Sequence, residues 1–417
     1  MDDMIMFFGS WVFALLFLFL LGVAVTFFLS FFRKQEYKEF NPKVSAVVPC
    51  YNEEKNAGKC IDAIYNSDYP EDIEVIAVDD GSDDGTLDVL KKYQKKYSKM
   101  KIIKGNHEGK SEALNKGIKK AKNEIIFTVD ADTIVSKDTL KKLTGPFLDK
   151  NVGATNGSCI VRNKNNFWGL FQNIEYHYNN LIRKSFSVLF NEGIWFFGAF
   201  ACYRKCVLEK AGYFKKDALT EDADIALEIY SKGYKAVNVY DSYGYVLAPS
   251  KLKDFIAQRT RWWMGVLQSL KKNRHLFSHK SSLSILFLFV NQYWWSAYSL
   301  LSLPLIIYQF YYWLPFDPGT FYEISAYTFR WFSASGPVYV LYMIPVWGLS
   351  IYNIFGVLSG MITTILLIGA LFMFKEKLSL KNLIGVFFYF PYTIVLNSII
   401  IISLIKIRFL KRQYFIK

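Results

Sequence analysis

The sequence is poor in the residues that build metal centres and disulfide frameworks. Only 5 cysteines and 4 histidines occur among its 417 residues, and no Cys or His pair completes a zinc-binding set. The spacing of Cys202 and Cys206 would place them on one face of a helix. We nevertheless expect the five cysteines to be reduced and to serve as small buried hydrophobic residues. Internal repeats and low-complexity tracts are also absent, which excludes repeat architectures.

Charge is absent from one long apolar run, Phe7–Phe32. About 20 residues suffice for a helix to cross the hydrocarbon core of a membrane. The run is too long for the apolar core of a signal peptide and has no basic segment before it, so residues 1–34 are predicted to form an uncleaved anchor. Basic residues follow it, at Arg33, Lys34 and Lys38. The positive-inside rule therefore predicts that the chain after residue 33 lies in the cytoplasm, against the cell membrane.

Residues 281–417 are apolar again and predict a bundle of transmembrane helices. The candidate spans are Leu283–Trp313, Val338–Phe374 and Leu383–Leu404. The middle stretch is too long for one straight crossing, so it predicts either a span with an interfacial helix or two spans that meet near Ser350. Basic residues flank the last stretch on both sides and leave the topology open. We expect four or five spans in a multi-pass protein.

The chain is basic, with a formal net charge of +14. Such a balance is typical of proteins that bind nucleic acid, anionic lipid or phosphorylated substrates. The apolar runs favour membrane lipids and phosphorylated substrates, and we expect no nucleic acid partner. Residues 251–280 include a basic, Trp-bearing amphipathic segment, Lys251–Lys272, which predicts a helix at the membrane interface.

Residues 35–250 have the pattern of an α/β domain that lies outside the membrane. The predicted strands are Val44–Val48, Ile73–Val78, Lys101–Lys104 and Glu124–Val129. The predicted helices between them are Asn52–Asn66, Thr86–Tyr97 and Ser111–Ala121. This alternation predicts a doubly wound, mostly parallel sheet. Ligands of such sheets bind beyond the carboxyl ends of the strands, where this sequence places its acidic segments.

Two acidic segments follow predicted strands. Asp79-Asp80-Gly81-Ser82 could accept hydrogen bonds from a ribose or a base edge, or could simply form a turn. Asp130 and Asp132 end a buried strand, and on an extended chain they would point the same way, roughly 7 Å apart. Mg²⁺ usually takes one or two carboxylates together with substrate phosphates. This second pair predicts a site for a divalent cation and a diphosphate. The alternative interpretation is that the two acids are only polar residues at the end of a strand.

Two helix starts carry further candidates. Lys110 begins a predicted helix and could meet a phosphate together with free backbone N–H groups, or could be a solvated residue. Thr220 is a predicted N-cap of the helix Asp222–Lys232. Asp222, in the first turn, could be a general base that accepts the proton of an acceptor hydroxyl. Alternatively, it could only complement the helix dipole.

The interfacial segment contains Gln258-Arg259-Thr260-Arg261-Trp262. Gln258, Arg261 and Trp262 would share one helix face, and Arg259 would lie about a quarter turn away. Arg261 suits a diphosphate leaving group, and Trp262 offers a flat surface for a sugar ring. A basic and aromatic belt at the membrane surface is the alternative interpretation.

In their order and spacing, these motifs resemble those of the family-2 membrane glycosyltransferases, a group that includes cellulose, hyaluronan, chitin and poly-N-acetylglucosamine synthases. The resemblance covers about half of the chain. It rests on Val48-Pro49-Cys50-Tyr51-Asn52-Glu53, Val78-Asp79-Asp80-Gly81-Ser82, the DxD motif Asp130–Asp132, the TED motif Thr220–Asp222 and the QxxRW motif Gln258–Trp262. It implies a glycosyltransferase A-type α/β fold beside a helical membrane bundle, and hexosyl transfer from a nucleotide-diphosphate sugar, which we expect to be a UDP-sugar.

The resemblance also implies a role for each matching residue. Asp222 would be the catalytic base. Binding of the nucleotide sugar would involve Tyr51, Glu53, Asp80, Lys110, Asp130, Gln258, Arg261 and Trp262. Mg²⁺ or Mn²⁺ would be held with the diphosphate by Asp130 and Asp132. The acceptor would be contacted by Trp195, Phe197, Gly198 and Glu221. Relatives carry a cysteine after the aromatic residue that matches Phe197, and this chain does not.

The expected reaction is an inverting single displacement that extends a polysaccharide and is coupled to its translocation across the membrane. Some relatives with the same motifs instead add one sugar to a polyprenyl-phosphate or other lipid acceptor. A protein that only senses nucleotide sugars should lack at least one acid of the set, and all are present here. Four aromatic residues could line a translocation tunnel or form a membrane-surface belt: Trp263, Trp294, Trp295 and Tyr298.

Overall fold

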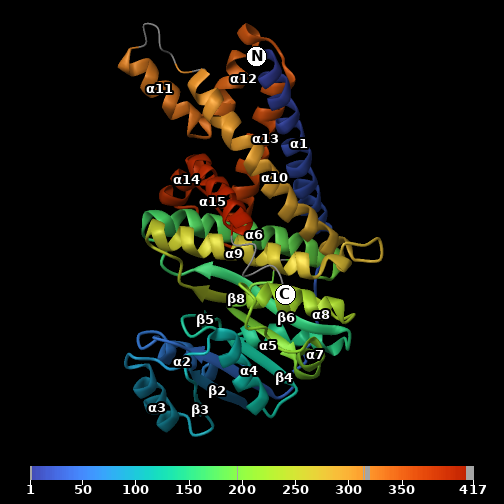
Figure 1. The fold of residues 1–417 in the computed structure, drawn as a ribbon, viewed down its shortest axis with the longest axis vertical. Coiled ribbons are helices and arrows are strands. Elements are labelled where there is room, and N and C mark those ends of the chain that lie inside the picture. Colours follow the sequence, from blue (N-terminus) through green and yellow to red (C-terminus); the bar gives the residue numbers. More distant parts are fainter. Residues whose placement is uncertain (1, 195, 313, 315–319, 410–417) are drawn as a thin grey trace.

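The computed structural model describes residues 2–194, 196–312, 314 and 320–409. An α/β domain occupies one end of the molecule and a bundle of long helices occupies the other (Figure 1). Two helices lie across the molecule between these parts, α6 (Phe167–Phe190) and α9 (Leu252–Lys272). The chain therefore has the two parts that its composition predicts.

One eight-stranded sheet with the order β3-β2-β1-β4-β7-β6-β8-β5 forms the centre of the α/β domain. Its strands are β1 (Val44–Cys50), β2 (Ile73–Asp79), β3 (Lys101–Lys104), β4 (Ile125–Val129), β5 (Ile134–Val135), β6 (Val152–Val161), β7 (Phe200–Arg204) and β8 (Lys235–Val246). The first four strands are parallel, as predicted. Strand β7 runs antiparallel to both β4 and β6, so the sheet as a whole is mixed. The strand order reverses between β1 and β4, a position at which doubly wound sheets usually bind their ligands.

Both faces of the sheet are buried, and successive residues of β1 enter different cores. Val44, Ala46 and Val48 join the core on the side of α2 (Ala57–Tyr65), whereas Val47 joins the core on the side of α4 (Lys110–Lys120). This division follows from the two-residue period of a strand. The other helices of the domain are α3 (Thr86–Lys96), α5 (Thr139–Thr144), α7 (Lys205–Ala211) and α8 (Glu221–Ser231).

The predicted helix Asn52–Asn66 begins only at Ala57. Asn52 adopts a left-handed conformation with φ 55°, which no helix can include, and residues 51–56 form the loop at the carboxyl end of β1. The cysteine prediction is also partly wrong. Four cysteines are buried, but Cys206 is exposed on α7 while Cys202 lies in β7, so the two do not share a helix.

Seven helices make up the apolar part of the described chain: α1 (Asp2–Leu29), α10 (Leu283–Tyr312), α11 (Phe321–Trp331), α12 (Ser335–Trp347), α13 (Ile351–Met373), α14 (Leu380–Phe387) and α15 (Tyr389–Phe409). Within the described residues, three helical stretches are long and apolar enough to cross a membrane, namely Phe7–Phe32, Asn353–Met373 and Tyr389–Phe409. The apolar stretch Val338–Phe374 is interrupted near Ser350, because α12 ends before Gly348, which has a φ of 74°. Whether this stretch crosses the membrane once or twice stays a prediction. A total of four or five spans stays a prediction.

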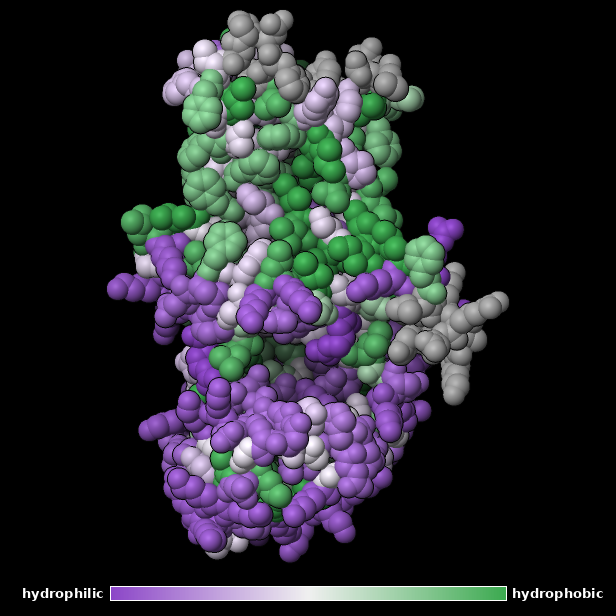
Figure 2. Space-filling model, turned by 60° about the vertical axis from the view of Figure 1, so that its left-hand side comes forward, coloured by the Kyte–Doolittle hydropathy of each residue, from purple (hydrophilic) through white to green (hydrophobic). Residues whose placement is uncertain are grey.

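The surface divides in the same way as the fold. Figure 2 shows a broad hydrophobic surface over the helical bundle, a hydrophilic surface over the α/β domain, and a hollow between them. Helix α9 has the predicted bounds to within one residue and packs on α8 and α15. Apolar side chains cover the outside of α1, among them Phe7, Trp11 and Leu18, which is the distribution expected for helices embedded in lipid.

Candidate active site

Three of the predicted site residues meet at one ion-paired cluster. The Lys110 Nζ atom lies 2.6 Å from Asp130 Oδ1 and 2.7 Å from Glu221 Oε1. Lys110 is the first residue of α4 and Gly109 precedes it with a φ of 95°, so the backbone turns here as only glycine readily allows. Burial alone would lower the pKa of Lys110, but the two carboxylates outweigh it and raise the pKa. Lys110 is therefore a fixed positive charge between the DxD and TED motifs.

The DxD acids lie on a turn and not on an extended strand. Thr133 N donates to Asp130 O at 2.9 Å, and residues 131–132 form the turn after β4. For this reason the expectation of an extended backbone between the two acids is wrong. Burial raises the pKa of Asp130 to about 7, an effect that the neighbouring Asp132 increases and Lys110 opposes. Burial also raises the pKa of Asp132. A cation beside these two acids would relieve the cost of charging them.

The same pair fits a divalent metal only when a substrate shares it. Within the described residues, no group of three or more His, Cys, Asp or Glu side chains could hold a metal ion by itself. Two carboxylates plus diphosphate oxygens are, however, a usual ligand set for Mg²⁺. Asp130 and Asp132 therefore fit a cation that arrives with, or is completed by, a nucleotide diphosphate.

Asp222 lies in the first turn of α8 with its carboxylate held by two backbone groups. Its Oδ2 atom accepts a hydrogen bond from Gly198 N at 2.7 Å, and its Oδ1 atom accepts one from Ala223 N at 2.8 Å. Burial raises the pKa of Asp222, and the adjacent Glu221 raises it further. For Glu221 itself burial would also raise the pKa, but Lys110 outweighs burial and lowers it. The pKa values of the two neighbouring acids are thus shifted in opposite directions. This separation favours Asp222, the acid with the raised pKa, as the proton acceptor.

The raised pKa of Asp222 predicts the acid side of the pH profile. A base must be ionised to accept a proton, and a raised pKa keeps it protonated up to a higher pH. We therefore expect kcat to fall with decreasing pH, with an apparent pKa above the ordinary Asp value of about 3.9. Turnover measured at saturating donor and metal between pH 4 and 9 would show this, and a profile flat down to an ordinary Asp pKa would contradict it.

Gly198 permits the close approach of its backbone to the Asp222 side chain. A Cβ atom at position 198 would lie 2.6 Å from Asp222 Cβ and 2.9 Å from Oδ2. We expect Gly198→Ala to displace the carboxylate and to lower kcat by about 10- to 100-fold, because small misplacements of a catalytic group have effects of that size. The control is Gly22→Ala in α1, where nothing lies within 4 Å of the added atom. Equal turnover of both variants would show that this contact is unimportant.

The three predicted nucleoside contacts lie at the carboxyl ends of β1 and β2. The Tyr51 ring stacks on His107 with a centroid distance of 4.2 Å. Glu53 accepts a hydrogen bond from Asn56 at 2.9 Å, and burial raises the pKa of its carboxyl. Both oxygens of the buried Asp80 accept backbone N–H groups, from Glu108 at 2.9 Å and from Gly109 at 2.7 Å.

Asp80 therefore holds the loop that precedes Lys110, a role that its motif does not reveal. Its carboxylate satisfies the donors that would otherwise be free to meet a phosphate. The predicted contact of Asp80 with a nucleoside stays a prediction. Of the acceptor residues, Phe197, Gly198 and Glu221 lie around Asp222, whereas Trp195 lies outside the described residues.

The QxxRW motif lies on α9 and faces the same site. Arg261 Nη1 donates to Leu219 O at 3.1 Å, directly before the TED motif. Arg259 had no assigned role but is almost fully buried, with its guanidinium 4.4 Å from the Trp262 ring centroid. It also donates to Gln258 Oε1 at 2.9 Å. Arg259 thus orients both neighbours that the motif assigns to the substrate.

Two residues remote in sequence hold Arg259 in place. Glu175 of α6 forms an ion pair with Arg259 Nη2 at 2.8 Å, and the hydroxyl of Tyr392 on α15 donates to the same carboxylate. The cluster joins α6, α9 and α15 at the boundary between the two parts of the molecule. Only the spacing of Arg259 and Trp262, three residues apart on a helix, could have indicated that their side chains meet.

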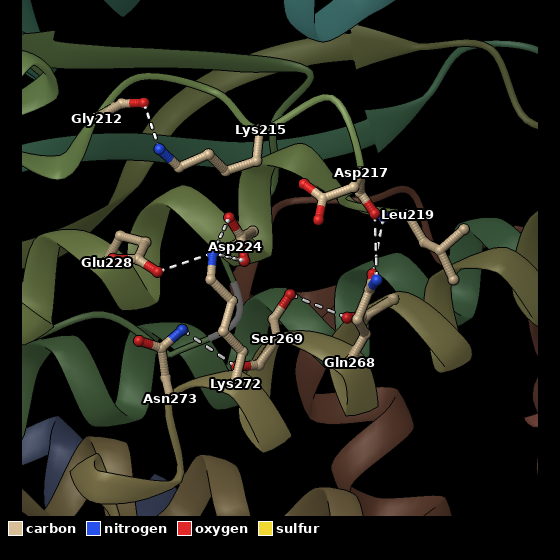
Figure 3. A network of polar contacts seen from close by, with 11 residues as sticks. Gly212, Lys215, Asp217, Leu219, Asp224, Glu228, Gln268, Ser269, Lys272 and Asn273 are labelled. Carbon is tan, nitrogen blue, oxygen red and sulfur yellow. Dashed lines mark hydrogen bonds and ion pairs between the residues drawn. The ribbon is translucent and has the colours of Figure 1, made fainter. Parts of the chain in front are cut away.

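A second set of polar contacts joins α9 to the TED motif (Figure 3). Gln268 accepts a hydrogen bond from Leu219 N at 3.0 Å and donates to Asp217 O at 3.1 Å. Lys272 Nζ lies 3.0 Å from Asp224 and 2.8 Å from Glu228, both on α8. Helix α9 therefore holds both the loop before the TED motif and the helix that contains it.

Thr220 occupies the predicted N-cap position of α8, but its side chain makes no capping hydrogen bond. The side chain packs against Gly265 of α9 instead, where a Cβ atom would lie 2.4 Å from Thr220 Oγ1. The helix end is as predicted, since Gly233 follows α8 with a φ of 80°. The Thr220 side chain thus contributes to the packing of α8 on α9 and does not cap α8.

A continuous cavity of about 1520 Å³ extends from the site into the helical bundle. The described site residues that line it are Lys110, Asp130, Asp132, Phe197, Gly198, Glu221, Asp222, Gln258, Arg261 and Trp262. The bundle contributes polar side chains, among them Asn291, Gln292, Gln309 and Asn397, and the aromatic residues Trp263, Trp295 and Tyr298. Trp294, the fourth predicted tunnel residue, does not line it. The volume exceeds the roughly 300–1,000 Å³ of a typical small-molecule pocket.

Known proteins include relatives of this chain in both sequence and structure. Two similar curated sequences are poly-β-1,6-N-acetyl-D-glucosamine synthases from Staphylococcus epidermidis and from Staphylococcus aureus strain COL. They are 29% identical over 224 and 223 residues, in each case 53% of this chain and 54% of the relative. The chain thus matches about half the length of these relatives. A solved mannosyltransferase from Pyrobaculum calidifontis, in complex with GDP-Man and Mn²⁺, has the same fold.

That structure is 19% identical, with a TM-score of 0.60, and the match covers 95% of this chain and 98% of the mannosyltransferase. The similarity therefore includes the helical bundle as well as the α/β domain. The model of the family described as "Glycosyltransferase like family 2" matches residues 42–265, more than half of the 417 residues, and this range contains every motif of the cluster. The chain therefore belongs to glycosyltransferase family 2.

Proposed function

We propose that this protein transfers a sugar from a nucleotide-diphosphate sugar, expected to be a UDP-sugar, to a growing polysaccharide that leaves through the helical bundle. The observation that supports this most is the cavity that joins the acids of the site to the interior of the bundle. Its wall contains amide-bearing and aromatic side chains, and side chains of these types are the ones that proteins commonly use to bind sugars. The names of the staphylococcal relatives support a polysaccharide product.

The site residues have distinct tasks in the proposed reaction. Asp222 accepts the proton of the acceptor hydroxyl as that oxygen attacks the anomeric carbon, and the sugar–phosphate bond breaks in the same step. Lys110 and Arg261 provide positive charge for the departing diphosphate. Trp262, with its ring fixed by Arg259, packs on the acceptor. Inversion at the anomeric carbon follows from a single displacement.

Asp130 and Asp132 would hold Mg²⁺ or Mn²⁺ together with the diphosphate. Such a cation would supply positive charge where the leaving group becomes more negative. The Mn²⁺ in the mannosyltransferase of the same fold supports a divalent metal here. Tyr51, Glu53 and Asp80 lie beside this site and are proposed to form the nucleoside end of the donor pocket.

A lipid acceptor is the second candidate, and the composition of the cavity wall supports it. Apolar residues of the bundle line a large part of the cavity, among them Leu16, Leu20, Ile306 and Leu396. A polyprenyl-phosphate could place its chain against this surface and its phosphate near the catalytic acids. In that case one sugar would be added and no polymer would pass through the bundle.

We propose a multi-pass arrangement in the cell membrane with the α/β domain in the cytoplasm. The basic residues after α1 support this orientation, as does the division of the surface in Figure 2. The cytoplasm is also where nucleotide sugars are available. Membrane lipids would surround α1, α13 and α15.

One experiment separates the two products. Purified protein in lipid nanodiscs with Mg²⁺ or Mn²⁺ is offered a panel of radiolabelled UDP- and GDP-sugars, and products are separated by gel and by organic extraction. Label in a high-mass, glycosidase-sensitive smear would support the polysaccharide and identify the donor. Label in the organic phase would support the lipid acceptor and remove translocation from the account. No incorporation from any donor would contradict both.

A further inference from the structure

Arg183 is a buried charge without a carboxylate partner in the described part of the chain. It lies on α6, is 1% exposed, and belongs to none of the ion pairs among the described residues. Its guanidinium donates instead to Gly157 O and Asn156 Oδ1, both at 2.9 Å, and to Asn180 Oδ1 at 3.3 Å. Burial lowers its pKa to about 10, so the group is still charged at neutral pH. A buried cation without a carboxylate to compensate it is a poor source of stability, which points to another role.

Asn156 connects Arg183 to the segment next to the catalytic base. Its Oδ1 atom accepts from Arg183 and, at 2.6 Å, from Asn238 Nδ2. Because that oxygen accepts two donors, the amide orientation of Asn156 is determined, and its Nδ2 group must point the other way. This group donates to Phe197 O at 3.2 Å. The Arg183 guanidinium also lies 4.2 Å from the centroid of the Phe197 ring.

The peptide group between Phe197 and Gly198 is therefore held at both ends. Its carbonyl accepts from Asn156, and its N–H group donates to Asp222 Oδ2 at 2.7 Å. A trans peptide is planar, with C=O and N–H pointing in opposite directions. Fixing the carbonyl on Asn156 thus aims the N–H at the carboxylate. If this peptide rotated, its carbonyl would face the Asp222 carboxylate and repel it.

A second asparagine fixes the other end of the same segment. Asn238 Oδ1 accepts from Ile194 N at 3.0 Å, and a Cβ atom at Gly193 would lie 2.9 Å from Asn238 Nδ2. Ile194, Phe197 and Gly198 all line the cavity beside Asp222. The wall of the acceptor site is thus supported from behind by one continuous set of buried polar contacts.

We propose that Arg183 and Asn156 are positioning residues that set the orientation of the Phe197–Gly198 peptide and, through it, the carboxylate of Asp222. This inference rests on the proposed function, in which Asp222 is the base. Neither residue touches a substrate. Their effect is expected on the catalytic step and on the pKa of the base, with little effect on donor binding.

Asn156→Asp tests this while keeping the acceptor that Arg183 and Asn238 need. The new carboxylate still accepts from Arg183 and Asn238 and adds an ion pair to Arg183, but it cannot donate to Phe197 O and repels it. We expect kcat to fall by about 10- to 100-fold. The KM for the donor and the affinity for the nucleotide diphosphate should stay within about twofold. Loss of the Gly198 N–H should also move the acid limb of the kcat profile to higher pH.

The matched control is Asn180→Asp. Asn180 likewise accepts from Arg183 and donates to a backbone carbonyl, that of Cys159 at 2.8 Å, but it does not contact the Phe197–Gly198 peptide. It should keep near wild-type kcat and the wild-type acid limb. Turnover is followed as release of nucleotide diphosphate, which counts transfer to a polysaccharide, a lipid or water alike. Should Asn156→Asp fail to fold, Arg183→Lys replaces it, because a lysine cannot make the paired contacts to Gly157 and Asn156.

The outcomes separate this inference from the proposed function. A selective loss of kcat with a shifted acid limb in Asn156→Asp, and not in Asn180→Asp, supports the positioning role. An unchanged kcat, or equal losses of kcat, donor affinity and thermal stability in both variants, overturns it. Normal polysaccharide or lipid products from the wild-type enzyme would then leave the proposed function intact. A wild-type enzyme that only hydrolyses the donor would contradict the proposed function, while the ratio between the variants would still test the positioning.

Discussion

An Asp222→Asn variant should lose about 10³-fold in kcat while its affinity for the nucleotide diphosphate changes little. General base catalysis contributes about 10²- to 10⁴-fold, and Asn cannot accept the proton of the acceptor hydroxyl. The amide keeps the size of the carboxylate and its oxygen can still accept from Gly198 N, so only the contact from Ala223 N is lost. Steady-state turnover and calorimetric titration with UDP and Mn²⁺ measure the two effects separately.

The control for this variant is Asp224→Asn, on the same helix. Asp224 is buried and paired with Lys272, and it faces α9 (Figure 3). Removing one partner of that pair should lower the melting temperature and leave kcat within a few-fold. If Asp222→Asn retained near-normal turnover, or if both variants lost activity alike, Asp222 would not be the base.

Asp132→Asn should weaken metal-dependent nucleotide binding as well as turnover. The change removes one of the two carboxylates proposed to hold the cation, and two such ligands suffice only because the diphosphate completes the set. We expect the Mn²⁺ concentration for half-maximal activity to rise by at least about tenfold. Nucleotide affinity should fall in the presence of Mn²⁺ and not in its absence. Metal titrations of activity and of nucleotide binding measure these effects.

Asp138→Asn is the matched control for the metal variant. Asp138 lies shortly after the DxD motif but is half-exposed and pairs with Lys142 away from the site. It should show wild-type metal dependence. A wild-type metal response in Asp132→Asn would contradict the assignment of the DxD motif, and a loss of nucleotide affinity without metal would indicate a direct contact instead.

The parts of the site that sequence patterns predicted are those with local signals. The DxD motif follows the end of β4 and the TED motif begins α8, and the alternation of apolar runs predicts both positions. The QxxRW motif lies inside α9, where its helical spacing predicts one shared face. The break between α12 and α13 was also predictable, because an apolar stretch of that length cannot cross a membrane once. The antiparallel β7 was not, because its pairing depends on strands distant along the chain.

The contacts that sequence patterns missed depend on distant residues or on loop geometry. Arg259 gains its role from Glu175, which is 84 residues away, and Tyr392, which contacts the same carboxylate, is 217 residues from Glu175. Asp80 turns toward the loop before Lys110 because two backbone N–H groups converge on it. Neither arrangement leaves a periodic trace in the sequence, so both required the structure.

The anomeric configuration of the product tests the proposed single displacement most directly. The product formed by wild-type protein from a donor of known anomeric configuration is isolated, and its new linkage is assigned from the anomeric proton coupling in its NMR spectrum. A single displacement, with Asp222 as the base and no covalent intermediate, predicts inversion, so an α-linked donor gives a β-linked product. Retention of the donor configuration would require a second displacement and would contradict the account.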